Sequence, residues 1–262
     1  MSRTDVVALP ESKTRIVVLG DPHGDLIGLV EVLEREDRPS VQIFSAGDNI
    51  GYADGPTSSE MCRILAEKKI PSVTGNHEAW SPKGRLFLGP PGAPLELTDE
   101  AQAFCRSLPY RIKIEAAAAR DLKLTLVHTV PEWNYVSPEN ARGFSVEEDA
   151  DVIFCGHTHR PAIYTVAPDR LSVENMSLAW TKPVVVPLEA GKRYIADAGS
   201  IARPNSGRKA TLGRGTYAAL DLVTRKLEIH AFSKKKRIEE LMKQVVEENT
   251  RRARAGQPPL GG

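Results

Sequence analysis

Five of the six histidines of this chain lie in short polar clusters that interrupt otherwise apolar sequence. These clusters are residues 20–24 (GDPHG), 75–78 (GNHE), 127–128 (VH) and 156–159 (GHTH), and a fifth at 47–49 (GDN) adds a carboxylate. Imidazole, carboxylate and amide groups without a thiolate form a mixed nitrogen and oxygen donor set, which suits Mn, Fe, Co, Ni or Zn. The residue types therefore predict a site for divalent metal ions.

Two of the clusters place two donors at a spacing of two residues. Asp21 and His23 form one pair, and His157 and His159 form the other. In an extended segment, side chains two residues apart point to the same side, so each pair can hold one ion. A lone histidine after a strand, such as His128, is usually a hydrogen-bonded structural residue. Its place in an ordered series of clusters favours a role as a ligand.

The clusters follow predicted strands, so residues distant in sequence can meet in space. Residues 15–20, 41–46 and 71–74 have the pattern of short buried strands, and they alternate with helices that begin near Leu26 and span 58–69. Such alternation predicts a mostly parallel sheet. Because loops at the carboxyl ends of such strands converge on one crevice, the polar clusters are expected there.

The second half of the chain is rich in strand patterns, and we expect a second, largely antiparallel sheet packed against the first. The predicted strands are residues 123–127, 152–155, 162–166, 194–197, 216–222 and 226–232. Residues 234–250 carry an apolar stripe at helical spacing, formed by Ile238, Leu241, Met242, Val245 and Val246. This stripe predicts a terminal amphipathic helix that docks on the preceding domain, followed by a loose tail over 251–262.

Composition excludes several classes of protein. The 262 residues include 35 Lys and Arg against 34 Asp and Glu, a net charge of +1. The chain therefore lacks the excess of basic residues that would favour binding along a nucleic-acid backbone. No apolar run is long enough for a membrane-spanning helix, and residues 1–13 lack the apolar core of a signal peptide. The three cysteines form no CxxC pair, which indicates free thiols in a reducing compartment. We expect a cytoplasmic protein without membrane or nucleic-acid partners.

The ordered blocks DxH, GD, GNHE, H and GHTH resemble the calcineurin-like metallophosphoesterase superfamily, and all five are intact. The phrases GDPHGDL, GDNIGY, GHTHRP and ADAGSIARPN look most like its small prokaryotic phosphodiesterase branch. The resemblance implies an α/β fold of four layers, α/β/β/α: a double β-sandwich of two mixed sheets flanked by helices. This domain would span residues 1–233, and the helix and tail would occupy 234–262.

The resemblance also implies two divalent cations, manganese first, with Fe, Ni, Co or Zn as alternatives. Asp48 would bridge them. The first ion would be held by Asp21, His23, Asp48 and His159, and the second by Asp48, Asn76, His128 and His157. The implied reaction is hydrolysis of a small phosphate ester by in-line attack of a metal-bridging hydroxide. The favoured substrate is a nucleotide-type phosphodiester. His77 would protonate the leaving group.

Several alternatives stay open from the sequence. The substrate class could instead be a phosphomonoester or a dinucleoside polyphosphate, and a nuclease or a non-catalytic scaffold on the same fold ranks below these. Protein Ser/Thr phosphatases of the superfamily carry GDxxDRG, whose Asp and Arg are replaced here by Gly51 and Tyr52. This departure counts against a protein phosphatase and leaves open what orients His77. Glu78 either orients that histidine or closes a turn.

Substrate contacts are the least constrained part of the sequence. Arg160 and Arg203 are candidates for binding phosphate. Trp80 and Trp133 lie near the clusters and could stack on a nucleobase, although tryptophan more often packs a loop onto the protein body. The predicted partner is a small phosphate ester, and a homo-oligomer is a further expectation.

Overall fold

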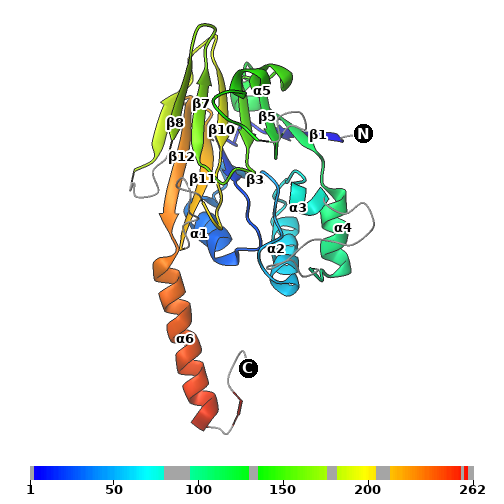
Figure 1. The fold of residues 1–262 in the computed structure, drawn as a ribbon, viewed down its shortest axis with the longest axis vertical. Helices are drawn as coiled ribbons and strands as arrows, with labels where there is room; N and C mark the ends of the chain where they lie inside the picture. The colour runs from blue at the N-terminus through cyan, green and yellow to red at the C-terminus, as the bar shows by residue number, and fades with distance from the viewer. Residues whose placement is uncertain are drawn as a thin grey trace.

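Two mixed β-sheets pack face to face in the computed structural model, which describes residues 3–79, 95–129, 135–175, 182–204, 213–254 and 257–258 (Figure 1). The seven-stranded sheet has the order β1 (Thr4–Leu9), β4 (Arg111–Ala116), β5 (Leu124–Val127), β6 (Val152–Cys155), β10 (Arg193–Asp197), β7 (Ala162–Val166), β8 (Leu171–Asn175). The five-stranded sheet has the order β3 (Val41–Ser45), β2 (Arg15–Leu19), β11 (Arg214–Asp221), β12 (Lys226–Ser233), β9 (Val184–Pro187).

The alternation of side chains along each strand explains how the layers form. In β2, Ile16 and Val18 face the other sheet and join one apolar cluster with Leu126 of β5 and Phe154 of β6. The intervening residues of β2 point to the opposite face. There they pack against α1 (Leu26–Glu36) and α2 (Gly55–Glu67). After Arg15 the strand is apolar, because both of its faces are covered.

A third apolar cluster covers the outer face of the seven-stranded sheet. Ile153 and Cys155 of β6 pack there with Phe144 of α5 (Ala141–Glu147). The order of layers is therefore helix, sheet, sheet, helix, which confirms the predicted α/β/β/α architecture. The remaining short elements are α3 (Asn76–Ala79), α4 (Asp99–Ser107) and a 3-10 turn, η1 (Ala117–Ala119).

The division of strands between the sheets differs from the expectation. Strands β11 and β12 come from the second half of the chain but complete the sheet of β2 and β3, with Ala218 paired antiparallel to Val18. Residues 71–74 form an isolated bridge, Ser45 to Ser72, rather than a strand. Local sequence patterns predict strands but not their partners, because pairing is decided by contacts between distant segments.

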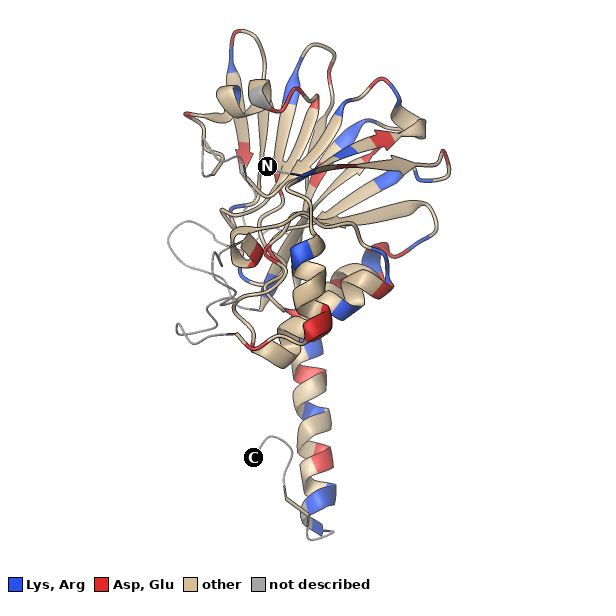
Figure 2. Ribbon diagram, turned by 90° about the vertical axis from the view of Figure 1, so that its right-hand side faces the viewer, with Lys and Arg blue, Asp and Glu red and all other residues tan. Residues whose placement is uncertain are grey.

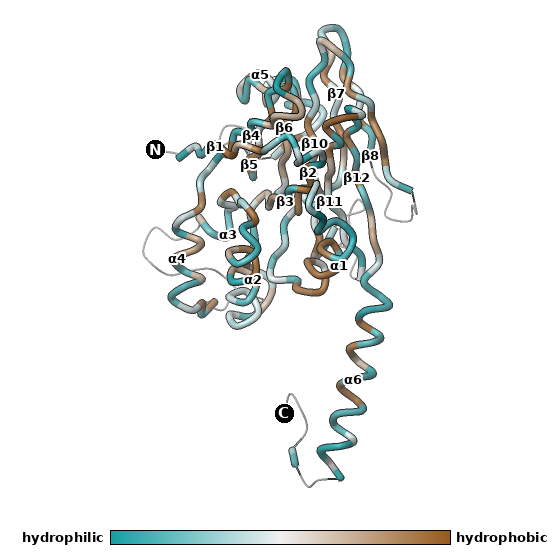
Figure 3. Tube along the Cα trace, turned by 180° about the vertical axis from the view of Figure 1, so that it is seen from behind, coloured by the Kyte–Doolittle hydropathy of each residue, from teal (hydrophilic) through white to brown (hydrophobic). Residues whose placement is uncertain are grey.

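The terminal helix α6 (Lys235–Arg254) forms, but it projects from the domain instead of docking on it (Figures 1 and 2). Apolar residues recur along this helix, shown in brown on the tube of Figure 3. Four of them remain 41–64% exposed: Leu241, Met242, Val245 and Val246. The expected docking is therefore wrong for this part of the helix. Residues 251–254 continue the helix rather than beginning a loose tail.

Among the described residues, the ion pairs between α6 and the body of the protein lie at the start of the helix. The Arg237 guanidinium pairs with Glu31 of α1 at 2.9 Å, and Lys234, just before the helix, donates to Asp25 at 2.5 Å. Further along, ion pairs between residues four apart, such as Lys243 with Glu247, support the helix itself. None of the helices in the described residues is both long and apolar enough to cross a membrane.

Candidate metal centre

The polar clusters meet where the carboxyl ends of strands from both sheets come together. In the part of the chain that the structure describes, three groups of potential ligands result, and within each group the ligand atoms lie within 4.8 Å of one another. The groups are Asp21, His23 and His159; His23, Asp48 and His77; and Asp48, His128 and His157. Residues 21–77 supply Asp21, His23, Asp48 and His77, and residues 128–159 supply the other three histidines.

The first group is organised around two facing imidazoles. His23 Nδ1 donates to the Ile50 carbonyl at 3.0 Å, and His159 Nδ1 donates to the Arg203 carbonyl at 3.1 Å. Because a carbonyl only accepts, each neutral ring keeps a lone pair on Nε2. These two Nε2 atoms are 2.9 Å apart, and Asp21 Oδ1 lies 3.7 Å from His159 Nε2. Converging lone pairs of this kind fit a shared cation.

The second group has the same construction. His128 Nδ1 donates to the Ala46 carbonyl at 2.8 Å, which turns Nε2 toward the other donors of the group. That Nε2 lies 3.0 Å from Asn76 Oδ1, 3.2 Å from His157 Nδ1 and 3.4 Å from Asp48 Oδ2. Asp48 Oδ2 is also 4.0 Å from His23 Nε2. The Asp48 carboxylate therefore stands between the two groups.

The backbone of the site is held in uncommon conformations. Asp21, His23, Asp48, His157 and His159 all have φ between 36° and 75°. For residues other than glycine this left-handed region costs roughly 1–2 kcal/mol each, and such strain concentrates at functional sites. Gly75 lets the backbone approach closely, since a Cβ there would lie 2.1 Å from Asp48 Oδ1.

Burial sets the protonation states of most of these groups. It lowers the pKa of His23, His77 and His157, and it lowers the pKa of His159 to about 4. These imidazoles are therefore neutral near pH 7 and have a lone pair to offer.

Asp48 and His128 form a coupled pair that departs from this pattern. Burial opposes the charged form of each, but their mutual attraction prevails. It lowers the pKa of Asp48 and raises the pKa of His128 to about 10. Burial raises the pKa of Asp21, and the charge of Asp48 adds to this.

Comparison with known proteins identifies the family. Residues 14–224 match the family model described as the calcineurin-like phosphoesterase superfamily domain. The chain belongs to this superfamily. No curated protein sequence matches it significantly. It is a metallophosphoesterase-family protein with a buried Asp and His cluster suited to binding divalent metal ions.

Two solved structures illustrate the likeness. A metallophosphoesterase from Sphaerobacter thermophilus shares 26% sequence identity with a TM-score of 0.64, and the match covers 94% of this chain and 95% of that one. A predicted phosphoesterase from Streptococcus pneumoniae TIGR4 shares 17% identity with a TM-score of 0.45, covering 85% of this chain and 90% of that one.

Within the metallophosphoesterase site, Glu78 closes its own turn through Gly75, as one of the two sequence interpretations expected, and it also binds a second loop. Its carboxylate accepts hydrogen bonds from the backbone N–H groups of Asp48 at 3.0 Å, Asn49 at 2.6 Å, Ile50 at 3.3 Å and Gly75 at 2.7 Å. Glu78 therefore holds the loop of Asp48 against the loop of Asn76. Burial, followed by the charge of Asp48, raises the pKa of Glu78 to about 7.

Asp197 is a second positioning residue that the sequence reasoning missed. It ends β10, is fully buried, and accepts from Thr158 Oγ1 at 2.5 Å and from the Gly199 N–H at 2.9 Å. Thr158 lies between His157 and His159, so this contact fixes the turn that carries both ligands. The sequence feature that could have identified Asp197 is its position as a carboxylate at the end of an apolar run.

The remaining predicted site residues fall in different places. His77 donates its backbone N–H to Asp48 Oδ1 at 2.8 Å, and its half-buried ring lies 4.8 Å from the ring of His23. Arg203 adjoins the site, whereas Arg160 is exposed. Trp80 and Trp133 lie outside the described residues.

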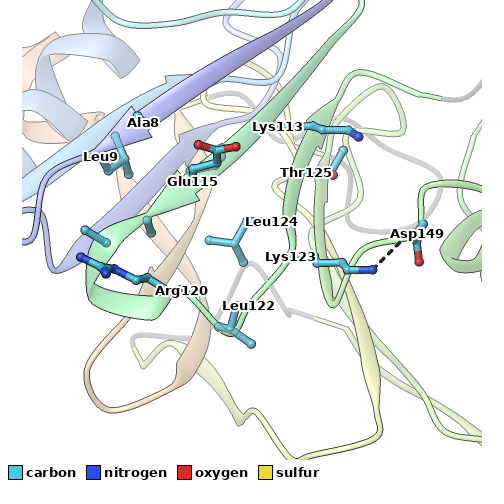
Figure 4. A pocket seen from close by; sticks show the side chains of 13 residues that line it. Ala8, Leu9, Lys113, Glu115, Arg120, Leu122, Lys123, Leu124, Thr125 and Asp149 are labelled. Carbon is cyan, nitrogen blue, oxygen red and sulfur yellow. Dashed lines mark hydrogen bonds and ion pairs between the residues drawn. The ribbon is translucent and has the colours of Figure 1, made fainter.

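A cavity of about 660 Å³ lies away from this centre, over β4 and β5 (Figure 4). Its lining mixes Lys113, Arg120 and Lys123 with Glu115 and Asp149, and Lys123 pairs with Asp149 at 3.1 Å. None of the candidate ligands lines it. The donor chemistry therefore places the functional site at the Asp and His cluster rather than in this cavity.

Proposed function

We propose that this metallophosphoesterase is a binuclear, metal-dependent hydrolase of small phosphate esters, and specifically a phosphodiesterase of the small prokaryotic branch acting on nucleotide-type substrates. The observation that carries the proposal is the position of Asp48, whose carboxylate lies between two groups of imidazole and carboxylate donors. A carboxylate shared in this way is the arrangement that two closely spaced cations require.

The proposed ligands follow from the two groups. Asp21, His23 and His159 would hold one cation, Asn76, His128 and His157 the other, and Asp48 both. Manganese is the first candidate, and Fe, Ni, Co or Zn fit the same donors. When bound, the two cations would supply an acidified water as nucleophile and would neutralise the phosphoryl oxygens.

The protein's own residues contribute orientation and a proton. Glu78 and Asp197 hold the loops that carry the ligands. His77 is anchored through its backbone to Asp48 but lies at the partly open side of the site, so its imidazole can protonate a leaving oxygen. General acid catalysis of this kind contributes roughly 10²–10⁴-fold.

A metal-by-substrate screen tests the proposal. Purified protein would be assayed with Mn, Fe, Co, Ni and Zn on bis(4-nitrophenyl) phosphate, 4-nitrophenyl phosphate, dinucleotides, dinucleoside polyphosphates and single-stranded RNA. We expect metal-dependent turnover with diesters ahead of monoesters. Faster turnover of the monoester would assign a phosphomonoesterase, and preference for RNA a nuclease. No turnover with any metal would overturn the proposal and would favour a non-catalytic scaffold on the same fold.

The role of His77 has a test of its own. The variant His77→Ala should keep its metal content but slow esters with poor leaving groups more than 4-nitrophenyl esters, because only a poor leaving group needs the proton. Equal slowing of both classes would remove the general-acid role, and loss of metal would make His77 a ligand instead.

A further inference from the structure

A second cavity, of about 370 Å³, opens directly beside the metal centre. Its lining includes residues near the metal centre and residues at or just before the start of α6, among them His23, Tyr52, Ile27, Arg203, Lys234 and Ile238. His23 belongs both to this cavity and to the first group of ligands. A molecule bound at the metal centre can therefore extend into the cavity.

Tyr52 and Arg203 form a stacked pair at the border between the two spaces. The Tyr52 ring centroid lies 4.2 Å from that of His23 and 5.4 Å from that of His77. The Arg203 guanidinium carbon lies 4.9 Å from the Tyr52 ring centroid, which is a cation–π contact. Tyr52 remains 40% exposed, so this pair faces the solvent-accessible entrance rather than the core.

The backbone of Arg203 is fixed by the metal centre itself. Its carbonyl accepts from His159 Nδ1 at 3.1 Å, and its N–H donates to Ser200 Oγ at 2.9 Å. Ser200 Oγ in turn donates to the Asp21 carbonyl at 2.8 Å. The position of the guanidinium is thus coupled to two of the candidate ligands.

The two cations of this cavity differ in what they bind. Lys234 Nζ is buried and donates to Asp25 Oδ2 at 2.5 Å, to the Ile201 carbonyl at 3.1 Å and to the Ala202 carbonyl at 2.9 Å, so its donors are used. Among the described residues no carboxylate forms an ion pair with Arg203. The Arg203 guanidinium contacts the Tyr52 ring. Its planar set of N–H donors matches the oxygens of a phosphoryl group.

We propose that Arg203, oriented by Tyr52, binds a second phosphoryl group of the substrate, next to the one that is hydrolysed. This inference rests on the proposed function. Divalent cations at the Asp and His cluster would neutralise the scissile phosphoryl group, so an additional cation at the entrance favours a substrate that carries further negative charge. Among the nucleotide-type substrates proposed above, those with a further phosphoryl group beside the scissile one, such as nucleoside or dinucleoside polyphosphates, are therefore favoured.

Kinetics on two substrates test this assignment with the metal-loaded full-length protein. Diadenosine tetraphosphate carries additional phosphoryl groups, whereas bis(4-nitrophenyl) phosphate carries none. We expect Arg203→Ala to raise KM for the tetraphosphate about 10–100-fold, the range for a lost hydrogen bond to a charged group. For the diester, kcat/KM should change less than about 3-fold. Arg203→Lys should recover part of the loss, and Tyr52→Ala should reproduce part of it. Arg251→Ala, on the distal part of α6, is the matched control.

A binding measurement separates charge recognition from catalysis. Isothermal titration with methylenebisphosphonate and with methylphosphonate compares two anions that both bind divalent metals but differ in the number of phosphonate groups. The wild type should prefer the bisphosphonate, and Arg203→Ala should lose most of this preference. If the wild type hydrolyses neither substrate, the proposed function fails. If it hydrolyses them but Arg203→Ala affects both equally or neither, the assignment of Arg203 is wrong.

Discussion

At the scale of residues, the site depends on how each imidazole is turned. In His23, His128 and His159, Nδ1 donates to a backbone carbonyl, so Nε2 is turned toward the shared space. Burial keeps His23 and His159 neutral by lowering the pKa of each. These are the conditions under which imidazole binds a divalent cation.

Asp48 should be the side chain on which metal occupancy depends most. The variant Asp48→Asn keeps the shape of the side chain but loses the charge shared by both groups of ligands. We expect metal content to fall from about two ions per chain to below about one, as measured by elemental analysis after gel filtration. The control is Asp54→Asn, an exposed helix cap at which asparagine serves equally well. Unchanged metal content in Asp48→Asn would contradict the bridging assignment.

Glu78 should matter for stability as well as for metal binding. In Glu78→Gln, an amide NH₂ group would face backbone N–H donors that now have a carboxylate oxygen. A buried donor left without an acceptor costs about 1–3 kcal/mol. The melting temperature should therefore fall, and metal affinity should fall with it, because the Asp48 loop loosens. Normal stability and normal metal affinity together would show that Glu78 does not position this loop.

At the scale of elements, a polar network fastens the five-stranded sheet to α1. Arg15 of β2 contacts Glu36 of α1 at 3.2 Å and Glu228 of β12 at 2.8 Å. Tyr217 of β11 donates to Glu36 at 2.9 Å, and its ring stacks on His230 at 4.9 Å. His230, to which the sequence assigned no role, is thus part of the packing between strands.

This network predicts a loss of stability in acid. Burial raises the pKa of Glu228, but its hydrogen bonds to His230 and Arg15 outweigh this and lower it to about 2. Because the pKa is lower in the folded state, the stabilisation is present above the unfolded value near 4.5 and disappears as pH falls toward 2. Denaturant unfolding between pH 6 and 3 should show a shallower pH dependence for Glu228→Gln than for the wild type. Glu115→Gln, an exposed control, should follow the wild type.

At the scale of the whole molecule, the site joins the two sheets. The Asp21 carboxylate accepts from the His157 N–H at 2.9 Å, so a loop after β2 in one sheet contacts a loop after β6 in the other. The four-layer fold was predictable from the motifs. The sequence did not predict that β11 and β12 join the five-stranded sheet, because contacts between distant segments decide which strands pair.

The projecting α6 makes the state of assembly testable, since a homo-oligomer remains a proposal. Val246 is 64% exposed, so in a monomer Val246→Glu should change stability by no more than about 0.5 kcal/mol. Light scattering and thermal unfolding of the wild type, Val246→Glu and the control Lys243→Glu would be compared. A wild-type mass above one chain that Val246→Glu alone reduces would show that α6 pairs with a second copy. An unchanged monomeric mass would exclude this role.

The sequence by itself determined the donor types, their order and their positions after strands, because metal chemistry and strand periodicity are local properties of the chain. Tertiary structure decided which donors share a group, since Asp48 meets His128 only where two sheets pack together. It also decided the roles of Glu78 and Asp197, whose contacts lie on loops distant in sequence. The exposure of α6 was also decided by the tertiary structure. An apolar stripe predicts that a helix face is buried, but it does not identify the surface against which that face would pack.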